Sequence, residues 1–132
     1  MGETVTLADK YGPWAFVAGG AVGMGGAYCD RLAQEGMNVV VCDRDADALD
    51  GKCAQLERDF GIRTVPVTVD LGALDALDTV SAATDELDID VLVYNVAVAK
   101  PGWQLDVGAE QKVRELRVDV VGMRVAAQMV VP

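Results

Sequence analysis

The sequence predicts an α/β fold in which a doubly wound parallel sheet is covered by helices on both faces, giving three layers (α/β/α). Apolar runs of strand length alternate with segments of helical periodicity, which is the pattern of successive strand–helix–strand units. A glycine cluster at residues 19–25 lies between the first apolar run and the first helical segment, and Asp43 directly follows the second run. With 132 residues, 52% of them hydrophobic, the chain can form one domain with a sizeable core.

Local signals bound each expected element. Ala15 to Ala18 is expected to be a buried strand, and a helix from Gly25 to Glu35 ends before Gly36. Asp45 is a candidate N-cap for the second helix, which ends at Phe60 before Gly61. The other expected elements are a strand at 38–42, a strand from Arg63 to Val69, a third helix with Leu71, Leu74, Leu77 and Val80 on one face, a strand from Ile89 to Val96, and a last helix of about Ala109 to Val130.

The glycine cluster has the composition of a phosphate-binding turn. Gly19, Gly23 and Gly25 allow a tight turn and a close approach of backbone to a pyrophosphate, and the first amides of the following helix face the anion. Glycines also mark ordinary turns and close helix–strand contacts, so a plain structural turn is the alternative interpretation. The strand before the cluster, the helix after it and Asp43 at the tip of the second strand favour dinucleotide binding.

Asp43 predicts which dinucleotide is bound. A carboxylate at this strand end can accept both ribose hydroxyls of NAD and would repel the 2′-phosphate of NADP. Arg44 could hold such a phosphate, but Asp43 and Asp45 flank it. NAD is therefore the expected cofactor, and NADP is less favoured.

The spacing Gly19-x-x-x-Gly23-x-Gly25 resembles the Thr-Gly-x-x-x-Gly-x-Gly turn of the short-chain dehydrogenase/reductase family. Other segments along the whole chain are similar to that family. Cys42-Asp43-Arg44 is similar to the strand end that selects NAD, and Val69-Asp70-Leu71 is similar to the segment with the Asp that meets the adenine. Residues 90–97 are similar to the fourth strand, which ends in Asn-Asn-Ala-Gly. Asp119 stands where a long helix of the family carries a catalytic-site Asn. The resemblance implies a Rossmann-type sheet of strand order 3-2-1-4, truncated after the fourth strand and the long helix that follows.

The resemblance also implies a function and a set of site residues. The function is hydride transfer between a nicotinamide dinucleotide and a carbonyl or alcohol substrate, with this chain as the dinucleotide-binding half. Asp119 stands at the implied catalytic-site position, and the loop 100–103 is expected near the nicotinamide. The implied cofactor-binding residues are Gly19, Ala21, Val22, Gly23, Met24, Gly25, Asp43, Arg44, Asp70, Leu71, Asn95, Val96 and Ala97.

Several positions depart from the family pattern. Ala18 replaces the Thr of the turn, Tyr94 replaces the first Asn of Asn-Asn-Ala-Gly, Val96-Ala97 replaces its Ala-Gly, and Asp119 replaces Asn. Most of the lost groups form hydrogen bonds, and each missing bond is expected to weaken local order or cofactor contact by about 0.5–1.5 kcal/mol. Cofactor affinity is therefore expected to be lower than is usual in the family.

No residue of the chain matches the family's catalytic acid. The family carries a Ser on the fifth strand and a Tyr-x-x-x-Lys pair on the next helix, and this chain ends before those segments. Its tyrosines are Tyr11, Tyr28 and Tyr94, and none is followed by Lys four positions later. Reduction of a carbonyl needs an acid to protonate the forming alkoxide, so residues 1–132 are expected to form a single dinucleotide-binding domain without turnover of its own.

The last helix has apolar side chains on opposite sides. At about 100° per residue, one face contains Val113, Leu116, Val120, Met123, Ala127 and Val130, and the opposite face contains Val118, Val121, Val125 and Met129. One sheet cannot cover both faces, so the second face is expected to pack against another part of the fold or another subunit. The family resemblance implies a dimer contact through this helix.

Charge and composition exclude several classes of partner. Eleven basic and twenty-one acidic residues give a net charge of −10, which argues against binding to nucleic acid or an anionic membrane. No apolar run approaches the ~18 residues of a membrane span, and the first residues lack the basic start of a signal peptide, so a cytoplasmic location is expected. Cys29, Cys42 and Cys53 form no close-spaced pair and the chain has no His, so we expect no metal site and reduced, buried thiols.

Three functions from different classes remain open at this stage. The first is an NAD-dependent oxidoreductase of the short-chain type, present as its cofactor-binding half. The second is a non-catalytic nucleotide-binding protein, which the altered Asn-Asn-Ala-Gly segment and Asp119 would suit. The third is an oligomerising protein that keeps the fold without the cofactor, for which the two apolar faces of the last helix are the supporting feature.

Overall fold

A four-stranded parallel sheet forms the centre of the molecule in our computed structural model, which describes residues 2–98 and 101–128. The strands are β1 (Trp14–Ala18), β2 (Asn38–Asp43), β3 (Thr64–Thr68) and β4 (Ile89–Tyr94). They lie in the order β3-β2-β1-β4, and each neighbouring pair is parallel. The predicted strand order is confirmed.

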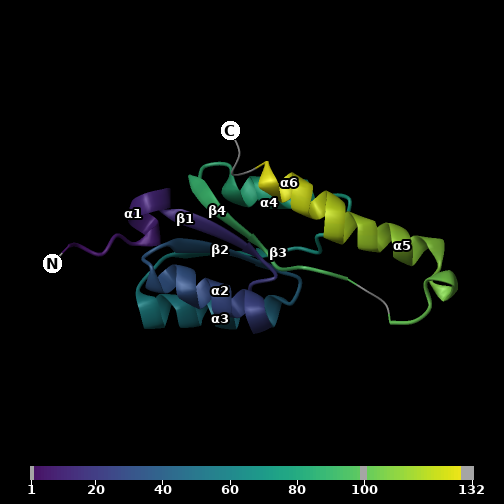
Figure 1. Cartoon of the computed structure of the whole chain (residues 1–132), viewed down its shortest axis with the longest axis horizontal. Coiled ribbons are helices and arrows are strands. Elements are labelled where there is room, and N and C mark those ends of the chain that lie inside the picture. The colour runs from purple at the N-terminus through teal and green to yellow at the C-terminus, as the bar shows by residue number, and fades with distance from the viewer. Residues whose placement is uncertain (1, 99–100, 129–132) are drawn as a thin grey trace.

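Helices cover both faces of this sheet, as Figure 1 shows. Helices α2 and α3 lie on one face, and α4 and α6 lie on the other, which confirms the three-layer arrangement. The helices are α1 (Leu7–Tyr11), α2 (Gly23–Gln34), α3 (Ala46–Phe60), α4 (Ala76–Thr84), the 3₁₀ helix η1 (Gln104–Asp106), α5 (Ala109–Leu116), the π-helical segment η2 (Arg117–Gly122) and α6 (Met123–Ala127).

The core has two parts because successive side chains of a strand point to opposite faces of the sheet. In β1, Ala15 and Val17 pack toward α2 and α3, together with Leu49 and Leu56 of α3. Phe16 packs on the other face, in a cluster with side chains of β2, β3 and α4. Every residue of β1 is buried, which is expected of a central strand in a sheet covered on both sides.

The ends of α3 follow the predicted capping pattern. The Asp45 carboxylate accepts a hydrogen bond from the Ala48 amide at 3.1 Å, and Gly61 ends the helix in the left-handed region with φ of 67°, which suits a residue without Cβ. The short helix α1 was not predicted. It begins with a capping box between Thr6 and Asp9, and its brevity leaves little periodicity to detect.

The third predicted helix begins later than expected. Leu71 to Asp75 form a turn, and α4 starts at Ala76, so the predicted helical face through Leu71 and Leu74 is wrong. The Asp70 side chain accepts a hydrogen bond from the Gly72 amide at 2.9 Å, and this local bond gives the backbone an alternative to a helix. Leu74 is consequently 84% exposed.

The last helix is not one regular α-helix. The π-helical segment η2 separates α5 from α6 and uses more residues per turn than an α-helix, so faces drawn at 100° per residue do not persist through it. On the first predicted face, Val113, Leu116, Val120 and Met123 are 45% to 59% exposed. On the second, Val118 is 1% exposed but Val121 is 54% exposed. Met129 and Val130 lie outside the described residues.

Candidate functional site

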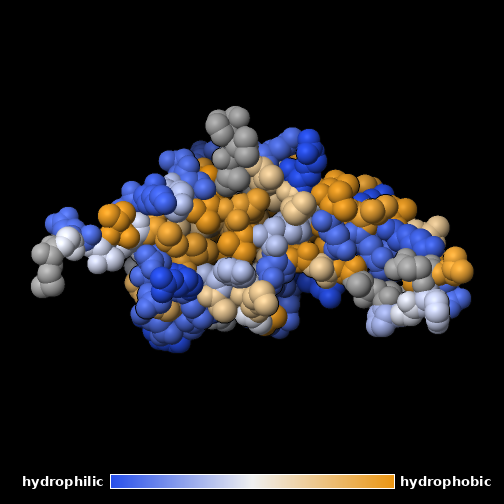
Figure 2. Space-filling view, viewed as in Figure 1, coloured by the Kyte–Doolittle hydropathy of each residue, from blue (hydrophilic) through white to orange (hydrophobic). Residues whose placement is uncertain are grey.

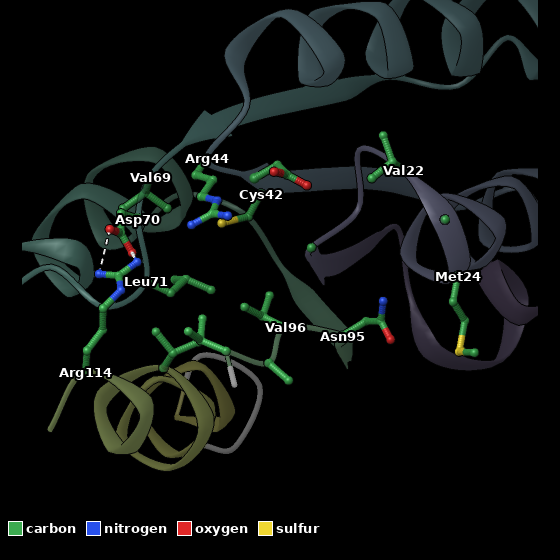
Figure 3. A pocket seen from close by; sticks show the side chains of 16 residues that line it. Val22, Met24, Cys42, Arg44, Val69, Asp70, Leu71, Asn95, Val96 and Arg114 are labelled. Atoms are coloured by element: carbon green, nitrogen blue, oxygen red, sulfur yellow. Dashed lines mark hydrogen bonds and ion pairs between the residues drawn. The ribbon is translucent and has the colours of Figure 1, made fainter. Parts of the chain in front are cut away.

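A cavity of about 320 Å³ lies where the four strands end. Its walls come from the segments that directly follow the carboxyl ends of β1, β2, β3 and β4, with further side chains from α5 and η2 (Figure 3). In open parallel sheets of this kind, ligands bind at the carboxyl ends of the strands, where the strand order reverses. Here that reversal lies between β1 and β4.

The glycine turn after β1 is closely packed against α2. A Cβ at Gly25 would lie 1.8 Å from the Gly19 carbonyl oxygen, and Gly19 itself has φ of 74°. Gly23 also has a positive φ, of 60°, and nothing lies within 4 Å of the position of its missing Cβ. Helix α2 begins at Gly23 with Val22 as its N-cap, which provides no capping hydrogen bond from its side chain. The first amides of α2 therefore lack a side-chain cap at the edge of the cavity.

Asp43 connects the end of β2 to the glycine turn. One carboxylate oxygen accepts a hydrogen bond from the Ala21 amide and the other from the Asp45 amide, each at 3.2 Å. Asp43 is half-buried and Arg44 is exposed, and both line the cavity. In Figure 3, Arg44 and Cys42 are on the same side of the cavity.

Asp70 follows β3 and pairs with Arg114 of α5. The guanidinium donates to both carboxylate oxygens, with Nη1 to Oδ2 at 2.9 Å and Nη2 to Oδ1 at 3.1 Å. These bonds hold the pKa of Asp70 below its ordinary value of 3.8. The pair forms part of the cavity wall beside Val69 and Leu71.

Hydrogen bonds to the end of β1 and to the last helices hold the segment that follows β4. The Asn95 amide donates to the Ala18 carbonyl at 2.9 Å, and the Val98 amide donates to the Asp119 carboxylate, also at 2.9 Å. The Tyr94 hydroxyl donates to the Val118 carbonyl within the π-helical segment, and burial raises the pKa of Tyr94 to about 12.

Most of the predicted cofactor residues meet at this cavity. Those that line it are Gly19, Val22, Gly23, Met24, Asp43, Arg44, Asp70, Leu71, Asn95, Val96 and Ala97. Ala21 and Gly25 do not line it and act through backbone contacts within the turn. Asp119, predicted at the catalytic-site position, is half-buried and binds the Val98 amide beside the cavity wall.

Five other lining residues are not among the predicted cofactor-binding residues. They are Cys42, Val69, Val98, Arg114 and Val118. Cys42, Val69 and Val98 are neighbours of predicted residues and could have been found from the strand ends alone. Arg114 and Val118 reach the cavity only through the path of the last helix, for which the sequence offers no local signal.

The cysteines and the acids do not form a metal centre within the described residues. Cys29, Cys42 and Cys53 are free and buried, and burial raises the pKa of both Cys29 and Cys42 to about 12. Within the same part of the chain, no helix has both the length and the apolar character required to cross a membrane.

The sheet order and the glycine turn between β1 and α2 define a Rossmann-type fold, the fold class in which the carboxyl ends of the strands commonly bind a dinucleotide. The model of a family described as short chain dehydrogenase matches residues 13–132. The chain belongs to this short-chain dehydrogenase family.

Curated relatives match nearly the whole chain but are much longer than it. The 7beta-hydroxysteroid dehydrogenase of Mediterraneibacter gnavus is 35% identical over 117 residues, which are 89% of this chain and 44% of the relative. The very-long-chain 3-oxoacyl-CoA reductase of Bos taurus is 34% identical over 109 residues, 81% of this chain and 35% of the relative. The chain thus spans less than half the length of these relatives.

Solved structures share the fold. A 7beta-hydroxysteroid dehydrogenase superposes with a TM-score of 0.90 at 30% identity, covering 93% of this chain and 48% of the other. A short-chain dehydrogenase from Sphingobium yanoikuyae in complex with NADPH has a TM-score of 0.83 at 25% identity, covering 89% and 46%.

Proposed function

We propose that this chain is the nicotinamide-dinucleotide-binding half of an oxidoreductase that transfers hydride between the nicotinamide and a carbonyl or alcohol. The supporting observation is the convergence of the glycine turn, Asp43, Asp70 and the segment 95–97 on one cavity at the strand ends. A relative solved in complex with NADPH is consistent with this cofactor class.

The residues around the cavity fit a dinucleotide. The first amides of α2 would face the pyrophosphate, because Val22 offers no side-chain cap and helix N-termini favour anions. Asp43 would accept ribose hydroxyls, and Asp70 and Leu71 would lie against the adenine. The segment 95–97 would adjoin the nicotinamide half. The bound dinucleotide would supply the hydride carrier, and the chain would supply binding and orientation.

Asp119 is proposed as a positioning residue in the place where the family carries a catalytic-site Asn. Its carboxylate holds the Val98 amide and so fixes the chain that leaves β4. The acid that protonates the alkoxide would come from a catalytic half outside these 132 residues, and the chain alone would bind the cofactor without turnover.

NAD is the proposed cofactor in preference to NADP. Each oxygen of the Asp43 carboxylate accepts one amide hydrogen bond and can accept another from a ribose hydroxyl, whereas its charge would repel a 2′-phosphate. Arg44 is the opposing influence, since an exposed guanidinium at the same cavity could pair with that phosphate.

Replacing Asp43 tests both the site and the preference. Asp43→Ala removes the repelling charge and the acceptor, so we expect NADH to bind about tenfold more weakly and NADPH to bind as well as or better than before. Dissociation constants for the two reduced dinucleotides measure this ratio. Asp47→Ala is the matched control, because Asp47 is an exposed acid of α3 outside the cavity. An unchanged NADH-to-NADPH ratio in Asp43→Ala would contradict the assignment.

Self-association through the last helices is the proposed mode of assembly. Val113, Leu116, Val120 and Met123 leave about half of their side-chain surface exposed, and Figure 2 shows hydrophobic surface along this part of the molecule. An apolar surface of this kind on a helix is typical of an interaction site. The second candidate function, a non-catalytic oligomerising protein, rests on the same surface.

A further inference from the structure

The pair between Asp70 and Arg114 joins two distant parts of the chain at the cavity wall. Asp70 lies in the turn after β3, and Arg114 lies on α5, which follows β4. Both carboxylate oxygens accept hydrogen bonds from the same guanidinium, a bidentate arrangement that fixes orientation as well as distance. Figure 3 shows this pair at one end of the cavity.

Helix α5 lies at the surface of the molecule. None of its residues is buried, and in Figure 1 it extends beyond the sheet. The bidentate pair connects α5 to the turn after β3 and so helps to position this wall of the cavity.

The turn after β3 is shaped around the guanidinium. A Cβ at Gly72 would lie 2.9 Å from Arg114 Nη1 and 3.0 Å from a methyl carbon of Val118. The Gly72 amide also donates to Asp70 Oδ1 at 2.9 Å. Gly72 thus leaves room for Arg114 and at the same time helps to hold the carboxylate.

The hydrogen bonds leave one acceptor site on Asp70. Oδ1 accepts from Gly72 and from Arg114 Nη2, whereas Oδ2 accepts only from Arg114 Nη1. Each carboxylate oxygen can accept about two hydrogen bonds, so Oδ2 retains one. The exocyclic amine of adenine is a donor that suits it. The carbonyl oxygen that hypoxanthine carries at the same position is an acceptor and does not.

We propose that Arg114 is a positioning residue for the adenine end of the site, because it orients Asp70 so that Oδ2 accepts a hydrogen bond from the adenine amine. This inference rests on the proposed dinucleotide function. It assigns base discrimination to a residue of α5 that need not touch the ligand.

The test compares two dinucleotides that differ only at the base. NADH and its hypoxanthine analogue, deamino-NADH, are titrated against the 132-residue chain and against Arg114→Met, Arg114→Lys and Asp70→Ala. The matched control is Arg117→Met, since Arg117 is an exposed arginine on the next segment and does not line this cavity. Circular dichroism checks that each variant is folded, which we expect because α5 has no buried side chain.

We expect the parent chain to bind NADH several-fold more tightly than deamino-NADH. Arg114→Met should weaken NADH binding by about three- to tenfold and deamino-NADH binding much less, so that the ratio of the two constants approaches one. Arg114→Lys should retain part of the preference for NADH over deamino-NADH, and Arg117→Met should retain all of it. In a chain that already carries Asp70→Ala, adding Arg114→Met should cause no further loss of this preference.

Two contrary results are distinguishable. If the parent binds NADH and Arg114→Met weakens both dinucleotides by the same factor, or neither, Arg114 does not orient the acceptor and the inference is wrong. If Arg114→Met does not fold, the ratio of the dissociation constants for NADH and deamino-NADH is measured for Arg114→Lys instead. A ratio equal to that of the parent chain contradicts the inference. If the folded parent binds neither dinucleotide, the proposed function fails, and the inference fails with it.

Discussion

At the residue scale, the acids at the strand ends organise the backbone before any ligand arrives. Asp43 accepts from the amides of Ala21 and Asp45, and Asp70 accepts from Gly72 and Arg114. Both side chains are thereby oriented in the free protein. A preformed acceptor loses less conformational entropy on binding, so these bonds favour cofactor binding even though they use part of the acceptor capacity.

Gly25 is the residue at which an added side chain should be most disruptive. An alanine Cβ would lie 1.8 Å from the Gly19 carbonyl oxygen, so the turn or α2 must move. We expect Gly25→Ala to lower the free energy of unfolding by about 1–3 kcal/mol and to weaken NADH binding at least tenfold, measured by denaturant unfolding and titration.

Gly51 provides the control for that substitution. It lies within α3 with nothing within 4 Å of its missing Cβ, so Gly51→Ala should stabilise the protein by about 0.5–1 kcal/mol through helix propensity and leave NADH affinity unchanged. If Gly25→Ala behaved like Gly51→Ala, the close packing of the glycine turn would not be required for binding.

At the element scale, the parts predicted from the sequence are those with a local cause. The glycine turn, the Asp45 cap and the alternation of strands and helices depend on residues close together in the chain, and the structure confirms them. The start of α4 is set by a local bond that hydrophobic periodicity does not reveal, from the Gly72 amide to the Asp70 carboxylate. The π-helical segment depends on another element, since the Tyr94 hydroxyl of β4 donates to its Val118 carbonyl.

The same distinction holds for the site. The glycine turn and Asp43 were predicted from their places after the first two strands, and Asp70, Leu71 and residues 95–97 from the family resemblance. Arg114 was not predicted, because its partner Asp70 is 44 positions away in the sequence. Only the direction in which α5 runs brings the two side chains together.

The exposed face of α5 and η2 gives a prediction about assembly. Leu116 and Val120 are 59% and 52% exposed, and a charge on this face would have to be desolvated in an apolar contact. We expect Leu116→Glu combined with Val120→Lys to shift the protein toward monomer, measured by sedimentation velocity over a concentration range.

Val5→Glu is the control for that pair of changes, since Val5 is also an exposed apolar residue, at 68%, but lies near the N-terminus ahead of α1. It should leave the association state unchanged. A parent chain that is already monomeric, or an oligomer that survives the double substitution, would contradict assembly through this face.

At the scale of the whole molecule, the sheet has an unpaired side at β4. Among the described residues β4 pairs only with β1, and an unpaired strand edge favours association with another strand. The chain spans 44% of its hydroxysteroid dehydrogenase relative.

Charge also acts at this scale. The net charge of −10 opposes the approach of an anionic dinucleotide, and this repulsion is screened by salt. The uncapped amides of α2 and the exposed Arg44 are local positive groups around the cavity, whereas Arg114 is paired with Asp70. Binding therefore depends on this local arrangement rather than on the overall charge.

Residues 19–43 and the neighbouring strand ends are proposed to form a working dinucleotide site. Titration of the 132-residue chain with NADH and separately with NADPH, followed by energy transfer from Trp14 and Trp103 to the nicotinamide, tests it most directly. We expect saturable binding with NADH preferred. No saturable binding of either dinucleotide by a cooperatively folded sample would contradict the account and leave the glycine turn with an architectural role only.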